Sequence, residues 1–139
     1  MWYICFTTDR PYVYQKVYQI DFTNGIGDDL MNYRIIAVDF DGTLCYSNWP
    51  ELGEPNMPLI EYLRVQKKSG NKLILWTCRA GEALENAVSW CRELHLEFDA
   101  VNDNLPEIIE KYGNNSRKIT CDYYIDDKAV LPEAVRACG

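Results

Sequence analysis

The stretch RIIAVDFDGT, residues 34–43, most constrains what this chain can fold into. Its run of mostly β-branched apolar residues is typical of a strand buried on both faces of a parallel sheet. The run ends on Asp39 and Asp41, which would project to the same face of a regular strand. Gly42 then permits a tight turn. A buried strand that ends on paired negative charge predicts a chemically specialised site.

Strand-like and helix-like segments alternate along the rest of the domain. In residues 82–94, for example, apolar side chains recur every three or four positions, the spacing of one helical face. Strands joined by helices imply right-handed crossovers and a parallel sheet covered on both faces, so we expect a three-layer, Rossmann-like α/β fold. Residues 44–57, rich in turn formers, are expected to form a loop. The expected strands are residues 34–40, 72–77, 98–101 and 121–125, and the expected helices are residues 58–68, 82–94, 106–112 and a short one from Pro132.

Residues 1–30 lie outside this alternation. They contain two strand-like segments, the second reading VYQKVYQIDF, and therefore predict a β-hairpin extension. Two strands alone are marginally stable, so the hairpin is expected to lean on the main domain or on a partner. We divide the chain into this extension and an α/β domain, residues 31–139. Alternatively, Met31 is the natural start, because a complete strand begins almost at once after it.

Composition limits the classes of partner. With 139 residues the domain is large enough for a hydrophobic core, and its 21 acidic against 14 basic residues give a net charge of -7. That charge argues against broad binding to nucleic acid or to an anionic membrane. No apolar run approaches the roughly 20 residues of a membrane span, and the N-terminus lacks an export signal, so we expect a cytoplasmic protein. The six cysteines form no C-x-x-C pair and are expected to be small buried thiols.

The paired acids predict a metal site. Without a partner, Asp39 and Asp41 would repel each other and one would take up a proton. A divalent cation resolves this conflict, and hard oxygen ligands at the end of a sheet suit Mg²⁺. Asp126 and Asp127, which follow a second predicted strand, are expected to complete the site.

With a cation in place, phosphoryl chemistry becomes available. An aspartate can attack a phosphoryl group, since the cation offsets the repulsion between the two anions. The neighbouring Asp41 is placed to protonate the leaving oxygen and then to deprotonate water. The residues therefore predict hydrolysis of a phosphomonoester.

Residues at other strand ends are candidates for holding the phosphate. The N–H groups at Gly42 and the hydroxyl of Thr77 can donate hydrogen bonds, and Lys118 can supply a cation just before the last strand. Lys72 and Lys128 compete with Lys118 for this role.

Arg79, two residues after Thr77, could grip a phosphate with two hydrogen bonds. The alternative is an arginine at a helix start that faces solvent or pairs with Glu82.

Four segments, taken in chain order, resemble the motifs of the haloacid dehalogenase-like (HAD) hydrolases. The first HAD motif, an apolar strand ending D-x-D-G-T, is matched by Asp39–Thr43, and the second, an apolar strand ending in Ser or Thr, by Leu73–Thr77. The third, a lysine before the last core strand, is matched by Lys118, and the fourth, an acidic pair after that strand, by Asp126-Asp127. The resemblance covers about residues 34–130.

This resemblance implies a role for each matched residue. Asp39 would be the nucleophile that becomes an aspartyl-phosphate, Asp41 the acid and base, and Thr77 and Lys118 the phosphate-holding groups. The implied metal ligands are Asp39, the backbone carbonyl of Asp41 and one acid of the final pair, with Asp127 favoured over Asp126.

The spacing between the motifs leaves no room for a large cap domain. The interval between Asp41 and Thr77 is filled by one loop and one helix, and that between Thr77 and Lys118 by two helices and a strand. The chain therefore resembles the small uncapped phosphatases of this family. An open site could accept a small phosphorylated molecule or the phosphorylated end of a larger one, and a second subunit could cover it. Residues 44–57 and the N-terminal hairpin are the other candidate lids.

Three other functions remain to be separated from this one. A receiver domain of two-component signalling also gathers Asp, Thr and Lys at strand ends, but its phosphorylated Asp lies near the middle of the chain, where this sequence has Thr77. The second is a catalytically silent HAD-like domain that binds phosphate or a partner. The third is a phosphatase acting on nucleic-acid ends, for which the sequence shows no binding groove.

Overall fold

The computed structural model describes residues 32–135, of which residues 33–135 belong to one compact unit. The hairpin predicted for residues 1–30 lies outside the described residues.

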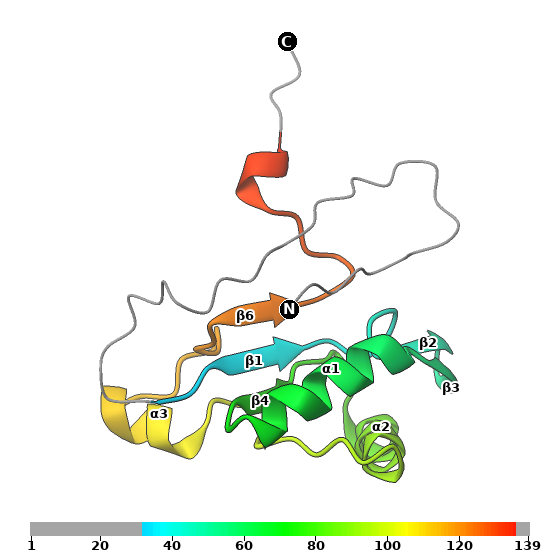
Figure 1. Ribbon diagram of the computed structural model, residues 1–139, viewed down its shortest axis with the longest axis horizontal. Coiled ribbons are helices and arrows are strands. Elements are labelled where there is room, and N and C mark those ends of the chain that lie inside the picture. The colour runs from blue at the N-terminus through cyan, green and yellow to red at the C-terminus, as the bar shows by residue number, and fades with distance from the viewer. Residues whose placement is uncertain (1–31, 136–139) are drawn as a thin grey trace. The chain divides into compact units, whose positions relative to one another are not determined.

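Four parallel strands form the central sheet in the order β5-β4-β1-β6 (Figure 1). In register, Val38 of β1 lies between Leu75 of β4 and Ile125 of β6. All four expected strands are present, so an α/β fold with a parallel sheet is confirmed, although each strand is shorter than expected. Their bounds are β1 Ile35–Val38, β4 Lys72–Leu75, β5 Ala100–Val101 and β6 Tyr123–Ile125.

The order of the strands reverses beside β1. The chain passes from β1 to β4 and on to β5, and then returns to place β6 on the other side of β1. In open α/β sheets, ligands bind at the carboxyl ends of the strands where such a reversal opens a crevice. In this sheet, that position is at the carboxyl ends of β1 and β6.

Helices join the strands as the apolar periodicity predicted. The side chain of Asn56 caps the first helix by accepting the N–H of Leu59, and the third helix ends at Gly113 with a left-handed φ of 68°. The last expected helix is only a single 3-10 turn, η1. The bounds are α1 Met57–Lys68, α2 Gly81–Glu93, α3 Pro106–Tyr112 and η1 Pro132–Ala134.

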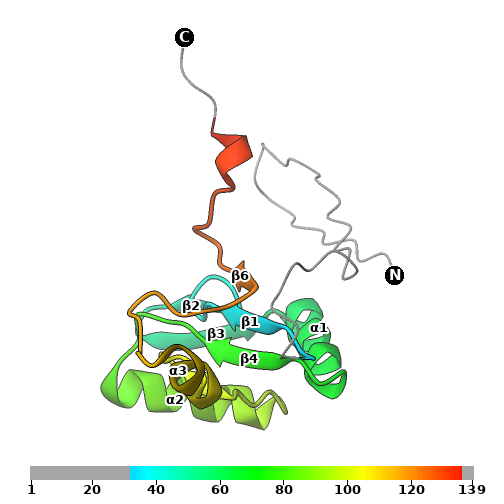
Figure 2. The ribbon, with the colours of Figure 1, turned by 90° about the vertical axis from the view of Figure 1, so that its left-hand side faces the viewer.

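The buried residues of β1 fall into two sets. Ile36 and Val38 belong to one core cluster, together with Leu63 of α1 and Ala87 of α2. Ala37 lies outside that cluster and is also fully buried, because alternate residues of a strand point to opposite faces. β1 is therefore covered on both faces, as its continuous apolar run predicted. Figure 2 shows the α-helices grouped around β1 and β4, away from the edge strand β6.

The segment expected to be a loop contains an antiparallel hairpin of β2 (Cys45–Asn48) and β3 (Glu51–Pro55). The loop prediction was wrong because turn-forming residues occupy strand positions. At Gly53 a Cβ atom would lie 2.0 Å from the carbonyl oxygen of Tyr46, so the close approach of the two strands requires glycine there. The hairpin lies beyond the end toward which β1 points (Figure 1).

The cysteines in residues 32–135 are free thiols, as predicted, but burial is not uniform. Cys45 and Cys91 are buried, whereas Cys78 is exposed. Separately, none of the helices between residues 32 and 135 combines the length and the apolar character that crossing a bilayer demands.

Candidate functional site

Three carboxylates meet at the ends of β1 and β6. Asp39 directly follows β1, and its N–H donates to the carbonyl of Ile125 at 2.9 Å, so the parallel pairing continues past β1. Asp126 and Asp127 directly follow β6. One oxygen from each of the three side chains lies within 4.8 Å of the others. The fold thus brings together acids that the sequence separates widely.

Thr43 links Asp39, after β1, to Asp127, after β6, within the acidic cluster (Asp39, Asp126 and Asp127). Its hydroxyl donates to Oδ2 of Asp39 at 3.0 Å and accepts the backbone N–H of Asp127, also at 3.0 Å. The side chain is buried, so these bonds form away from water. Thr43 was not among the predicted site residues, although it is the last residue of the DFDGT motif.

Gly42 allows Asp127 to approach the turn. Its φ is 80°, and a Cβ atom there would lie 2.5 Å from Oδ2 of Asp127. Its N–H donates to the carbonyl of Cys45 at 2.8 Å. The expectation that this N–H faces a phosphate needs correction, because the N–H is already paired within the turn. What Gly42 supplies is space for a carboxylate.

Electrostatics distinguish Asp39 from an ordinary surface acid. Burial raises its pKa to about 6; the hydrogen bond from Thr43 opposes this rise, and the negative charges of Asp126 and Asp127 add to it. A carboxylate whose ionised form is disfavoured by neighbouring negative charge gains from a bound cation. The cluster could therefore hold a divalent metal ion.

Asp41 turns toward a different partner. β1 ends at Val38 and the chain curls at once, so that the carbonyl of Phe40 accepts the N–H groups of residues 43–45. The expectation that Asp39 and Asp41 share a strand face was therefore wrong. Arg79 binds the Asp41 carboxylate instead, with Nη2 at 2.7 Å from Oδ1 and Nε at 2.9 Å from Oδ2.

This ion pair sets the charge of Asp41. Partial burial pushes the pKa of Asp41 upward, but hydrogen bonds from Arg79 and Ser47 and the charge of Arg79 outweigh it, so the pKa lies below its ordinary value. The Ser47 hydroxyl donates to Oδ1 of Asp41. Ser47 was expected only as a loop residue, and no local pattern marked it.

Arg79 is buried, with 1 % of its side chain exposed. Its Nη1 donates to the carbonyls of Pro50, at 3.2 Å, and Ala83, at 3.4 Å. The rings of Phe40 and Trp49 lie 4.9 and 4.8 Å from its Cζ. Arg79 therefore neither faces solvent nor pairs with Glu82. Its N–H groups donate to Asp41 and to backbone carbonyls. The prediction that they grip a phosphate is therefore not what this geometry favours.

Thr77 lies in the loop that follows β4, beside β1. Its N–H donates to Oδ1 of Asn102 at 2.8 Å, and its Oγ1 accepts the N–H of Arg79 at 3.1 Å. Asn102, with a φ of 51°, also donates from Nδ2 to the carbonyl of Arg79 at 3.3 Å. Since Thr77 Oγ1 acts as an acceptor here, its own O–H can be donated. Asn102 was predicted only as part of a turn, yet it fixes the loop that carries both Thr77 and Arg79.

The candidate lysines fall in different places. Lys72 begins β4 and lies 3.8 Å from Asp99, so it is at the opposite end of the sheet and cannot serve the site. Lys118 is exposed in the loop before β6, and within residues 32–135 no hydrogen bond or ion pair joins its side chain to the acidic cluster. The charge of Lys128 acts on Asp41. The structure thus eliminates one of the two competitors and leaves Lys118 and Lys128.

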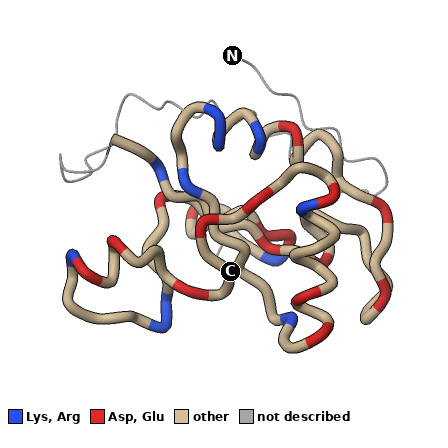
Figure 3. Tube along the Cα trace, turned by 90° about the horizontal axis from the view of Figure 1, so that it is seen from below, with Lys and Arg blue, Asp and Glu red and all other residues tan. Residues whose placement is uncertain are grey.

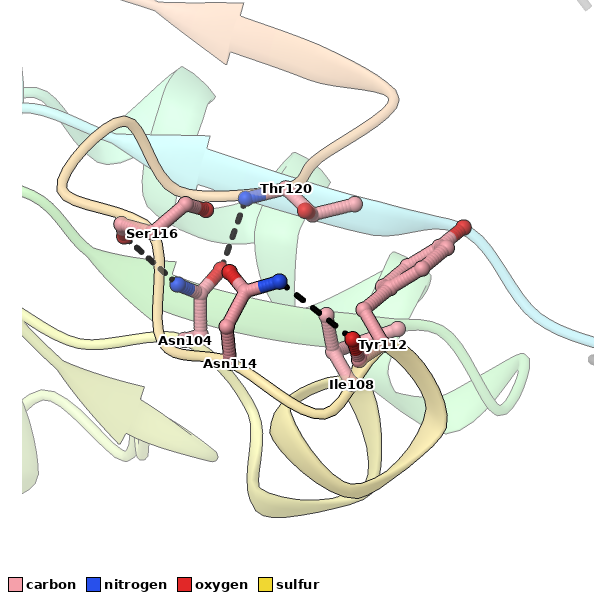
Figure 4. A pocket seen from close by; sticks show the side chains of 6 residues that line it. All are labelled: Asn104, Ile108, Tyr112, Asn114, Ser116 and Thr120. Atoms are coloured by element: carbon pink, nitrogen blue, oxygen red, sulfur yellow. Dashed lines mark hydrogen bonds between the residues drawn. The ribbon is translucent and has the colours of Figure 1, made fainter.

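Asn104 holds the loop that carries Lys118. Its Nδ2 donates to the carbonyl of Ser116 at 2.9 Å and its Oδ1 accepts the N–H of Thr120 at 2.7 Å (Figure 4). These bonds fix the chain on both sides of Lys118. A cavity of about 290 Å³ lies beside this loop and includes none of the predicted site residues; it is lined by Asn104, Ile108, Tyr112, Asn114, Ser116 and Thr120.

No family model and no curated protein matches the chain. Among solved structures, that of a conserved protein from Bacteroides thetaiotaomicron matches with 41% sequence identity and a TM-score of 0.63. The match covers 71% of this chain and 79% of that one. The chain belongs to the same family as this conserved protein.

The contact between Gly42 and Asp127 generates a prediction. Gly42→Ala would strain the backbone and force the Asp127 carboxylate away, so we expect affinity for Mg²⁺ to fall about tenfold or more. Gly113→Ala is the matched control, because Gly113 also has a positive φ but no atom within 4 Å of its would-be Cβ. Titration calorimetry with Mg²⁺ measures both variants, and equal affinities would contradict the role given to Gly42.

The raised pKa of Asp39 generates a second prediction, for protein kept in a chelator. The folded state holds the proton of the Asp39 carboxyl more tightly than the unfolded state does. The folding stability that this proton contributes is therefore present below pH ~4 and is lost as the pH rises through about 6. Asp39→Asn stays neutral and should therefore be more stable than the native protein at pH 7, by on the order of 1 kcal/mol after allowing for partial exposure. At pH 4 this difference should vanish.

Urea unfolding at the two pH values measures this difference. Glu93→Gln, which removes an exposed carboxylate of α2, serves as the control and should show little difference at either pH. An Asp39→Asn variant that gains no stability at pH 7 would contradict the electrostatic account.

Proposed function

We propose that this protein is a magnesium-dependent phosphomonoester hydrolase of the HAD-like, uncapped type. The observation that carries the proposal is the meeting of Asp39, Asp126 and Asp127 where the strand order reverses, together with the nearby Asp41 of the same motif, which is paired with Arg79. Two kinds of carboxylate in unlike surroundings suit a division between nucleophile and proton-transfer group.

The donor set fits Mg²⁺. It consists of carboxylate oxygens, which are hard ligands, and it lies at the edge of the sheet, where a hydrated ion can keep several waters. Asp39 and Asp127 would hold the ion through their side chains, and the backbone carbonyl of Asp41 is the third ligand that the motif implies. When bound, the ion offsets the repulsion between the attacking carboxylate and the phosphate.

Asp39 is the proposed nucleophile. Its carboxylate attacks phosphorus, the bond from phosphorus to the leaving oxygen breaks, and an aspartyl-phosphate forms. Thr43 donates to Oδ2 of Asp39, which orients the carboxylate for this attack. Water then attacks the phosphorus, releasing phosphate and restoring Asp39.

Asp41 is the proposed proton-transfer group. With a pKa held below its ordinary value by Arg79 and Ser47, it is ionised and ready to take a proton from the attacking water. The ion pair supports this base role more than the acid role, since an acid must first carry a proton. We assign the holding of the phosphate to the hydroxyl of Thr77, which can be donated because Oγ1 accepts the N–H of Arg79, and to the cation of Lys118 or Lys128.

The surroundings of the site favour a small or exposed phosphorylated group. The β2–β3 hairpin is the one insertion that follows the first motif within the described residues, and it is too short to enclose a substrate. Lys and Arg are interspersed with acidic residues along the described trace (Figure 3). This distribution gives no support to a track for nucleic acid.

A generic aryl phosphate tests the proposal. The native protein should release phosphate with Mg²⁺ and not with a chelator, and Asp39→Asn should lower the rate roughly a thousandfold or more, because it removes the nucleophile. Colorimetric detection of phosphate measures both. Activity that survives Asp39→Asn would remove the nucleophile assignment, and a native protein without activity would leave the silent binding domain as the better description.

The two acids after β6 should contribute unequally to metal binding. Asp127 packs on Gly42 and its N–H is fixed by Thr43, whereas Oδ1 of Asp126 accepts the N–H of Lys128 at 2.8 Å. Asp127→Ala should therefore raise the Mg²⁺ concentration needed for half-maximal activity about tenfold or more, and Asp126→Ala by much less. Measured Mg²⁺ dependence in the reverse order would make Asp126 the direct ligand.

A further inference from the structure

Trp49, at the tip of the β2–β3 hairpin, is a large aromatic residue that leaves 61% of its surface exposed. Its ring centre lies 4.8 Å from Cζ of Arg79, so the guanidinium covers part of the ring. The next residue, Pro50, accepts a hydrogen bond from the same guanidinium at 3.2 Å. The hairpin tip is therefore fixed in place while much of the indole remains open to solvent.

The position of this ring relative to Asp41 is what matters for a substrate. The guanidinium that contacts Trp49 also binds Asp41, with Nη2 at 2.7 Å from Oδ1. Only the width of one guanidinium group thus separates the indole from the proposed proton-transfer group. A leaving oxygen within reach of Asp41 would bring its substituent near the hairpin tip that carries Trp49, because Arg79 contacts both Asp41 and that tip.

The charges on the hairpin narrow the choice of substituent. Glu51 and Glu54 are both exposed on β3, and the neighbouring Leu52 is exposed as well. These acids disfavour a polyanionic leaving group such as a polynucleotide chain. A flat ring without charge gains from stacking on an indole that is already held in place.

We propose that Trp49 is a stacking platform that selects phosphomonoesters whose leaving group carries an uncharged aromatic ring. This inference rests on the proposed phosphatase function. Simple aryl phosphates and nucleoside monophosphates share this chemistry and differ in the distance from the phosphate to the ring.

Tyr46 provides a matched control on the same hairpin. It is 56% exposed, a fraction close to that of Trp49. The register of the hairpin shifts between Tyr46 and Asn48, and among the described residues no hydrogen bond or ring contact joins the Tyr46 side chain to Arg79 or Asp41. The removal of Tyr46 therefore tests the general effect of losing an exposed aromatic residue of this hairpin.

The experiment measures kcat and KM of the full-length protein with Mg²⁺ for phenyl phosphate, adenosine 5′-monophosphate and glycerol 2-phosphate, which has no ring. Trp49→Leu keeps an apolar cover over Arg79 but removes the aromatic ring, and Trp49→Phe keeps a ring. For Trp49→Leu we expect KM to rise about tenfold for a substrate with a ring, the size expected of one stacked ring, and far less for glycerol 2-phosphate. For Trp49→Phe, KM should rise much less than for Trp49→Leu. Tyr46→Ala should leave KM unchanged for substrates with a ring and for the substrate without one.

The two ring-bearing substrates identify the leaving group. A rise in KM confined to phenyl phosphate assigns the platform to a ring attached directly to the ester oxygen, and a rise confined to adenosine 5′-monophosphate assigns it to a ring beyond a sugar. Equal losses on all three substrates, or no loss on any, would overturn the role of Trp49 while leaving the phosphatase proposal intact. A native protein that releases no phosphate from any of them would overturn both.

Discussion

Carboxylates that repel one another are held together at the ends of β1 and β6, and the rest of the site is arranged around that constraint. The parallel pairing of these strands continues to Asp39, whose N–H bonds to Ile125, and so brings the acids of two distant segments to one place. Thr43 ties Asp39 to the backbone of Asp127, while Gly42 leaves room for the Asp127 carboxylate. Burial, together with the negative charges of Asp126 and Asp127, raises the pKa of Asp39, so the ionised form of this carboxyl is disfavoured without a cation.

The ion pair with Arg79 gives a fourth carboxylate, Asp41, surroundings unlike those of the three clustered acids. Arg79 contacts the turn after β1, the first turn of α2 and the tip of the β2–β3 hairpin. A buried guanidinium requires such partners, because an unpaired charge away from water is strongly destabilising. The position of Asp41 and that of the hairpin tip are therefore linked through one side chain. That link is why an exposed residue of the hairpin, Trp49, bears on the proposed choice of substrate.

Loop positions depend on asparagine side chains that the sequence did not distinguish from ordinary turn formers. Asn102 fixes the loop of Thr77 and Arg79, and Asn104 fixes the loop of Lys118. In each case one amide acts as donor and acceptor for backbone groups far along the chain. The groups proposed to hold phosphate therefore lie on loops whose shape is set by tertiary hydrogen bonds.

By itself, the sequence determined the four strands of the central sheet, the three α-helices between them and the identity of the acidic residues. Apolar periodicity and the DFDGT motif are local patterns. They predicted these four strands, four helices, of which the last is only a 3-10 turn, and the strand ends that meet at the site. Only the tertiary structure decided that Arg79 binds Asp41, that residues 45–55 form a hairpin and that Gly42 makes room for Asp127. Each of these depends on groups that are distant in sequence or on backbone spacing, and neither leaves a periodic signal in the chain.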